Sequence, residues 1–290
     1  MRHLVLCVIC ALCSGPLWAA ELVLQSQYRW TSEDPNFGGL SGLWMSPDGS
    51  RLLALSDRGY YARAEVARDE GKITDVTTTE LSQLPLVDDR APEDFLIDAE
   101  GLAIAPDGTI YVSYEGHHRV WAFDPDFKDP QWTHKWDYFW RFQSNSGLEA
   151  LAVDSQGVVY AIPERSGKWT RPFPVQRYKD EVWDEVLSIP RSKRFLVVGA
   201  DFGPDGRFYL LERDFDVLSA FKSRIRRFDL TDQGFVAEET LLETSFSVMD
   251  NAEGISLWVD NSGRTIVSII SDDNYSGLIR TLLTEYVLIE

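Results

Sequence analysis

The feature that most constrains this chain is a motif that occurs five times along it. Each copy has an apolar run, a turn that ends in glycine, a second run rich in β-branched and aromatic residues, and then an acidic residue; two copies are "DAEGLAIAPDGTIYVSYEG" and "DNAEGISLWVDNSGRTIVSIISDDN". The turn glycines are Gly49, Gly108, Gly157, Gly206 and Gly263, with spacings of 59, 49, 49 and 57 residues. Repeats of this length that consist of short strands are typical of β-propeller blades. The sequence therefore predicts an all-β fold in which each motif begins one blade.

Each repeat has room for two further strands, so each blade is predicted to have four. In the third repeat these are residues 174–178 and 183–189, whereas the last repeat supplies only one, residues 278–289. The segment "ELVLQSQYRW" can provide the missing outer strand, and this closure would remove an open sheet edge. We therefore predict one domain over residues 21–290, a β-propeller of five four-stranded blades closed by the N-terminal strand. The alternative is six blades, one of them very degenerate.

The first twenty residues, "MRHLVLCVICALCSGPLWAA", have the pattern of a secretory signal. Arg2 gives a positive start, an apolar run follows, and Ala19 and Ala20 offer small residues for cleavage. The apolar run, residues 4–13, is too short to span a bilayer. We predict a signal peptide at 1–20 and a periplasmic or secreted mature protein. All three cysteines lie in this segment, which excludes disulfides, a thiolate nucleophile and a cysteine metal site from the mature chain.

The formal net charge of −18 limits the partners of the chain. It argues against nucleic acid, because that binding depends on basic side chains that neutralise phosphates. We expect no membrane span, because no segment after residue 20 is apolar enough. The excess of acids can serve solubility, or it can bind cations where the acids converge. We expect a monomer that takes a small anionic or ester substrate.

The acids of the motif collect at one face of the predicted propeller. In each blade the innermost strand begins at the face where the second strand ends, and the glycine turns lie at the opposite face. Acids at the start of the inner strand are Glu100, Glu149 and Glu253, and acids at the end of the second strand are Asp57, Glu115, Glu164, Glu212 and Asp272. Single acids at strand ends often bind backbone N–H groups or face water. Several carboxylates on one axis need positive charge among them.

Calcium is one form of that positive charge, because it takes six to eight hard oxygen ligands that separate loops can supply. We predict one or more calcium ions near the axis, held by ligands from among Asp57, Glu100, Glu149, Glu253 and Asp272.

Arginine is the other possible source of positive charge near these acids. Arg58, Arg165 and Arg213 each follow an acid at the end of a second strand, and Lys168 and Arg171 occur in the loop "RSGKWTRPFP". These side chains could form a rim that binds an anion such as phosphate, or they could be surface ion pairs of little energetic value.

Several segments resemble the phytase-like propeller family, described as "esterase-like activity of phytase". They are "NSGLEALAVD", "YAIPE", "DFGPDGRFYLLERDF", "SRIRRFDL", "DNAEGISL" and "SIISDDNYSGLIRTLLTEYVL", and they extend over nearly all of the mature chain. The resemblance implies a β-propeller, an exported location and hydrolysis of phosphoesters or esters. The better understood calcium propeller phytases imply that calcium bridges the phosphate and that water attacks directly. The first repeat departs from the pattern, because it has "GLSGL", with Ser41, where an acidic "EGL" would complete the ring.

The leading hypothesis is an exported metal-dependent phosphoester or ester hydrolase. Glu149 or Glu253 would accept a proton from a water whose pKa a metal lowers, and Arg58, Arg165, Arg213, Lys168 and Arg171 would bind the substrate. One alternative is a non-catalytic exported propeller that binds a ligand or a protein on the same face. Another is a lactonase-type hydrolase of carboxylesters, which also uses calcium on a propeller axis.

Overall fold

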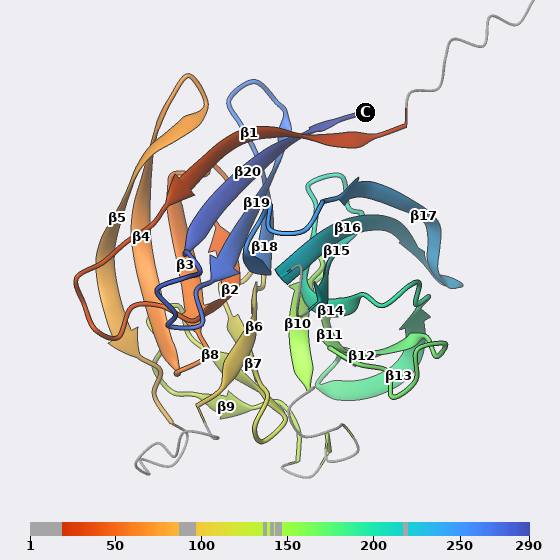
Figure 1. The fold of residues 1–290 in the computed structure, drawn as a ribbon. Coiled ribbons are helices and arrows are strands. Elements are labelled where there is room, and N and C mark those ends of the chain that lie inside the picture. Colours follow the sequence, from red (N-terminus) through yellow and green to blue (C-terminus); the bar gives the residue numbers. More distant parts are fainter. Residues whose placement is uncertain (1–18, 87–96, 136–137, 140–141, 143–146, 217–219) are drawn as a thin grey trace, which may run out of the picture.

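The computed structural model describes residues 19–86, 97–135, 138–139, 142, 147–216 and 220–290. Strands β1 to β20 form five antiparallel sheets of four strands each, and the described residues contain no helix. The five sheets stand around a common axis as the blades of a propeller (Figure 1). This arrangement confirms the predicted five-bladed fold and excludes six complete blades. Within the described part of the chain, no helix has the length and hydropathy needed to cross a membrane.

Each of the first four blades is built from consecutive strands, with the first strand innermost. Blade 1 consists of β2 (Leu40–Met45), β3 (Arg51–Ser56), β4 (Tyr60–Asp69) and β5 (Lys72–Gln83). Blade 2 consists of β6 (Ala99–Ile104), β7 (Ile110–Tyr114), β8 (Arg119–Phe123) and β9 (Gln131–Trp132). Blade 3 consists of β10 (Leu148–Val153), β11 (Val159–Pro163), β12 (Phe173–Lys179) and β13 (Val182–Ile189). Blade 4 consists of β14 (Leu196–Phe202), β15 (Phe208–Asp216), β16 (Ala220–Thr231) and β17 (Gly234–Glu243).

Blade 5 joins the two ends of the described chain. It consists of β18 (Asn251–Val259), β19 (Thr265–Asp272), β20 (Leu282–Ile289) and, as its outer strand, β1 (Glu21–Arg29). Strand β1 pairs antiparallel with β20 from Glu21 opposite Ile289 to Arg29 opposite Leu282, and the two strands lie side by side in Figure 1. The predicted closure by the N-terminal strand is therefore confirmed.

Local sequence explains both the turns and the narrow centre of the propeller. The five turn glycines have φ between 70° and 91°, a region that favours glycine. A second set of glycines lies in the inner strands, where a Cβ at Gly199 would lie 2.5 Å from the carbonyl oxygen of Glu253. Glycine thus lets neighbouring inner strands approach closely. Near the starts of these strands, beside Glu149 and Glu253, the space left along the axis is only about 10 Å³, whereas the end with the glycine turns opens into a cavity of about 710 Å³.

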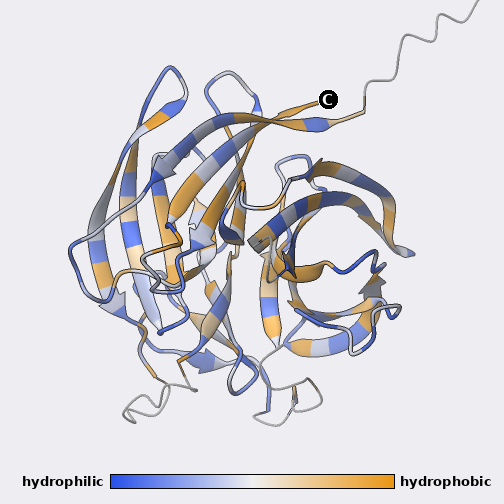
Figure 2. Ribbon diagram, viewed as in Figure 1, coloured by the Kyte–Doolittle hydropathy of each residue, from blue (hydrophilic) through white to orange (hydrophobic). Residues whose placement is uncertain are grey.

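Apolar side chains fill the interfaces between blades. Five clusters of buried residues each combine two neighbouring blades, such as Trp258 and Ile270 of blade 5 with Leu43 and Ala54 of blade 1. Figure 2 shows apolar and polar bands alternating along many strands, as expected when successive side chains point to opposite faces of a sheet. This packing fixes the inner strands, and therefore the side chains at their ends, in place.

Candidate functional site

The register of the first two strands in each blade shows which residues occupy equivalent places. The pairs Leu40–Ser56, Ala99–Tyr114, Leu148–Pro163, Val197–Glu212 and Ala252–Ser271 correspond across the five blades. The next residues along the second strands are Asp57, Glu115, Glu164, Arg213 and Asp272. A carboxylate therefore occupies this place in blades 1, 2, 3 and 5, and an arginine occupies it in blade 4.

The sequence predicted Glu212 at this place in blade 4. This prediction is wrong, because the structure has Arg213 there, one residue later. Glu212 is fully buried and accepts hydrogen bonds from Arg224 Nε (2.8 Å) and from Arg226 Nε (2.8 Å). Adjacent strand residues point to opposite faces of a sheet, so Glu212 enters the interior of the blade while Arg213 faces the axis. Counting seven residues from the turn glycine identifies Arg213, as it identifies Glu115 and Glu164.

The inner strands contribute a second set of carboxylates. Glu100, Glu149 and Glu253 come from β6, β10 and β18, and each is buried. One carboxylate oxygen from each lies within 4.8 Å of the others, as a group that could hold a metal ion. Three of the five predicted metal ligands are thus brought together. Asp57 and Asp272 lie at the ends of second strands. They belong to neither group of potential metal ligands found among the described residues.

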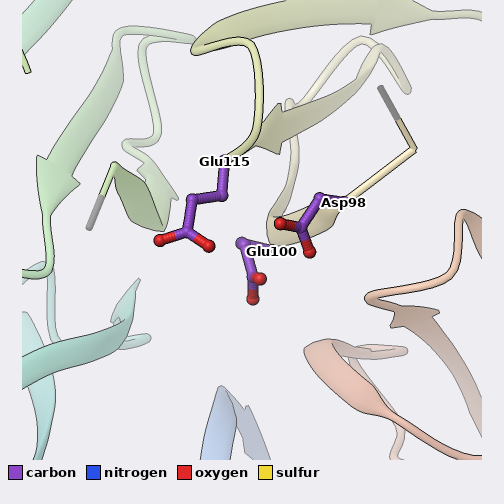
Figure 3. A group of neighbouring side chains, drawn as sticks. All are labelled: Asp98, Glu100 and Glu115. Atoms are coloured by element: carbon purple, nitrogen blue, oxygen red, sulfur yellow. The ribbon is translucent and has the colours of Figure 1, made fainter. Parts of the chain in front are cut away.

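Asp98 is a member of the site that the sequence analysis missed. It forms a second group with Glu100 and Glu115, again with oxygens within 4.8 Å, and Figure 3 shows the three side chains converging. The backbone N–H of Glu115 donates to the carbonyl of Asp98 (2.8 Å), which fixes the two residues opposite each other. The sequence does contain a signal for Asp98. In "DAE", Asp98 and Glu100 are two residues apart, and residues i and i+2 of an extended segment point the same way. Glu100 is common to both groups.

These side chains form what we call the acidic ring: Asp57, Asp98, Glu100, Glu115, Glu149, Glu164, Glu253 and Asp272. Burial, followed by neighbouring carboxylates, raises the pKa of Glu100 and of Glu149 well above the usual range. Burial and Asp98 raise the pKa of Glu115 to about 7. Burial, together with Glu253 and other acids, raises the pKa of Asp57 to about 7 and that of Asp272 to about 8. The ring therefore carries more negative charge than the surrounding side chains balance.

Arg213 is the positive charge inside this ring. Its Nη1 donates to Asn251 Oδ1 (2.6 Å) and to a carboxylate oxygen of Glu253, and its Nη2 lies 3.4 Å from Glu164 Oε1. Burial alone would lower the pKa of Arg213, but Glu253, Glu149 and Glu164 raise it on balance. Asn251 is buried and also donates to Asp272 Oδ2 (3.1 Å). Arg213 and Asn251 thus connect blades 3, 4 and 5 across the face.

The other predicted cationic residues lie outside the ring. The Nε of Arg165 forms an ion pair with Glu164 Oε2 at 3.0 Å, and its side chain is 50% exposed. The guanidinium carbon of Arg58 lies 3.3 Å from the centroid of the Tyr275 ring. Lys168 and Arg171 are exposed in the loop between β11 and β12. Of these five side chains, Arg213 is the one enclosed by acids.

A sequence model of the family described as "Phytase-like: Esterase-like activity of phytase" matches residues 35–275. The chain belongs to this family. The match extends from the loop before β2 to the loop after β19, so this phytase-like chain contains the family pattern in all five blades. No curated protein matches the sequence.

Two solved structures are among those similar to this phytase-like protein. Virginiamycin B lyase from Staphylococcus aureus has 14% sequence identity and a TM-score of 0.44, covering 90% of this chain and 74% of that one. The PQQ-bound aldose sugar dehydrogenase from Streptomyces coelicolor has 11% identity and a TM-score of 0.46, covering 91% of this chain and 98% of that one.

Proposed function

We propose that this phytase-like protein is an exported, calcium-dependent hydrolase of phosphoesters or esters, with the acidic ring as its catalytic centre. The observation that carries the proposal is the pair of overlapping carboxylate groups, Asp98–Glu100–Glu115 and Glu100–Glu149–Glu253. They lie at the end of the propeller axis, where side chains from several blades meet. A site of this kind can bind a cation and a substrate together.

The donor set fits calcium. All candidate ligands are carboxylate oxygens, the hard ligands that Ca²⁺ prefers. Asp98, Glu100 and Glu115 belong to blade 2, whereas Glu149 and Glu253 come from blades 3 and 5. Their raised pKa values mean that ionising the whole ring is unfavourable without added positive charge. Arg213 supplies one such charge, near Glu253 and Glu164. Arg119 acts on Asp98 and Arg213 acts on Glu149, whereas the main influences on the pKa of Glu100 and of Glu115 include no arginine. Glu100 and Glu115 are therefore the best candidates to hold the ion.

Calcium, when bound, would lower the pKa of a water and polarise the substrate oxygen. Of the two proposed proton acceptors, Glu149 suits the role better than Glu253. Arg213 and Asn251 both donate to Glu253, which stabilises its ionised form. Burial, followed by neighbouring acids, raises the pKa of Glu149, so it holds a proton more readily. In this proposal Arg165, half exposed at the edge of the ring, binds the anionic group of a substrate.

The test is a panel of phosphomonoesters, phytate, carboxylesters and lactones, assayed with calcium and with a chelator. We expect hydrolysis only with calcium, and a loss of about a hundredfold or more in Glu149→Gln. Glu65→Gln, an exposed change on β4, is the matched control and should keep full activity.

Calcium at a few hundred times its Kd should also stabilise the folded protein by about 3–4 kcal/mol. No turnover on any substrate, with calcium bound, would favour the alternative of a non-catalytic binding propeller.

Export is tested on the protein made in its host. We expect the mature chain to begin near Glu21, the first residue of β1, because a cut after Ala20 leaves the closing strand whole. N-terminal sequencing of protein from the periplasm or medium measures this. A mature chain that keeps Met1 would contradict the signal peptide.

A further inference from the structure

A groove on blade 3 lies beside the acidic ring. It has a volume of about 720 Å³, and its lining includes two arginines, Arg165 and Arg171, and the apolar side chains of Pro172, Pro174 and Leu187. A cavity that combines cationic and apolar walls is suited to a ligand with an anionic group on a non-polar body. Glu185 also contributes to the lining, and its carboxylate accepts a hydrogen bond from Gln176 Nε2 (2.5 Å). The arginines leave the groove positive in a protein with a net charge of −18.

Arg165 connects this groove to the ring. Its Nε lies 3.0 Å from Glu164 Oε2, and the other oxygen of Glu164 lies 3.4 Å from Nη2 of Arg213. The guanidinium of Arg165 is half exposed, so one edge can hold Glu164 while the other donors remain open to a ligand. An anionic group bound by Arg165 would therefore sit next to the acidic ring.

The loop that carries Arg171 is held in a fixed shape. Ser166 is buried, and its Oγ lies 3.0 Å from the carbonyl oxygen of Lys168 and 2.7 Å from that of Arg171. Arg191 donates to the same Oγ (3.0 Å) and stacks over the Trp169 ring at 4.4 Å. A preorganised loop loses little conformational entropy when a ligand binds. The backbone at Arg171 is thus fixed, and its exposed side chain contributes to the lining of the groove.

We propose that this groove binds the non-polar body of a small phosphomonoester, with its single phosphate between Arg165 and Arg171. This inference rests on the proposed function and narrows its substrate class. Two arginines suit one phosphate group, and the lining found among the described residues offers no further cationic side chain for a second phosphate. The apolar wall favours an aromatic or alkyl alcohol portion over a polyol. The substrate is thus an amphipathic monoester rather than a densely phosphorylated one.

The experiment is titration calorimetry of the mature protein with phosphonates, which keep the anionic group but cannot be hydrolysed. Methylphosphonate, phenylphosphonate and naphthylmethylphosphonate share one head group and differ in apolar surface. We expect affinity to rise along the series, with naphthylmethylphosphonate at least about tenfold tighter than methylphosphonate. Equal affinity for all three, or no binding, would overturn the inference.

Variants identify the site of binding. Arg171→Ala should weaken naphthylmethylphosphonate about tenfold to a hundredfold, because it removes charge-assisted hydrogen bonds. Lys179→Ala is the matched control: it removes one positive charge from the same blade, from a residue that does not line the groove, and should change affinity less than about twofold. Equal losses in both variants would refute binding in the groove. Calorimetry needs no turnover, so an inactive protein that binds the series would refute the proposed function alone.

Discussion

Arg213 and Arg165 have the same side chain and opposite surroundings, and this difference determines what their loss should do. The Arg213 side chain is 17% exposed and contacts two buried glutamates, whereas that of Arg165 is 50% exposed and contacts one. Removing one partner of a buried ion pair leaves an uncompensated charge and is costly, whereas an exposed pair contributes little.

We therefore expect Arg213→Ala to lower the free energy of unfolding by about 3–5 kcal/mol, because the buried Glu253 loses its countercharge and Glu164 keeps only the half-exposed Arg165. Arg165→Ala should lower it by less than about 1 kcal/mol while weakening binding of a phosphate ligand about tenfold or more. Urea unfolding and calorimetry on both variants measure the two quantities. The division of roles is refuted if Arg165→Ala proves the more destabilising change.

The pKa values of the ring predict how stability depends on pH. The folded-state pKa is raised to about 7 for Asp57 and Glu115 and to about 8 for Asp272. Folded protein therefore binds protons that the unfolded chain has released above about pH 4, and the free energy of unfolding falls as pH rises from about 4 to about 8. Without calcium, Tm should be at least about 5 °C higher at about pH 5 than at about pH 8. Calcium should reduce the difference, and a chelated protein whose Tm rises over this range would contradict the prediction.

At the scale of elements, strand β4 carries two arginines that test how blades 1 and 5 are joined. Arg68 forms an ion pair with the fully buried Glu285 of β20 at 2.5 Å, and its guanidinium carbon lies 4.7 Å from the ring centroid of Trp258. Arg63, on the same strand, pairs with Glu80 at 3.2 Å, and both side chains are more than one-third exposed. The first pair crosses the boundary between blades 1 and 5 and is buried. The second pair lies within blade 1, and Arg63 also donates to the carbonyl of Pro125 at the exposed surface (2.6 Å).

Arg68→Ala should therefore destabilise the protein by about 3–5 kcal/mol, because it leaves Glu285 buried without its partner. Arg63→Ala, the same substitution five residues earlier, should cost less than about 1 kcal/mol. Chemical denaturation of the two variants gives the comparison directly. Similar losses would mean that the contact between blades adds nothing specific.

The elements were also the part of the structure that the sequence predicted best. The turn after each inner strand needs a positive φ, so glycine marks it in the sequence, and the five glycines located the five blades. Register was harder to predict, because the distance from the turn glycine to the end of the second strand varies. It is seven residues in blades 2, 3 and 4, eight in blade 1 and nine in blade 5, and the choice between Glu212 and Arg213 depended on one residue. The burial of Glu212 against Arg224 and Arg226 arises from tertiary packing, which no local pattern records.

For the whole molecule, ring closure depends on one strand that belongs to blade 5 and also contacts blade 1. Strand β1 pairs with β20 along its length. Across the boundary, Ser26 Oγ accepts the backbone N–H of Ile73 (2.9 Å), Gln25 donates to the carbonyl of Gly71 (2.6 Å), and Trp30 Nε1 donates to Thr78 Oγ1 (3.1 Å). The first blade and the last are thus tied by the chain's N-terminal segment.

A chain that lacks residues 21–30 should therefore lose closure and expose the edge of β20. An exposed, apolar edge strand pairs readily with another chain. We expect a Tm lower by at least about 10 °C and concentration-dependent self-association, measured by thermal unfolding and sedimentation. Addition of a peptide with the sequence of residues 21–30 should restore both, which separates loss of closure from general misfolding. Leu24→Thr, at a side chain 56% exposed, keeps the strand and should change Tm little. A truncated chain that stays monomeric with unchanged Tm would show that the other four blades and the remaining three strands close the ring unaided.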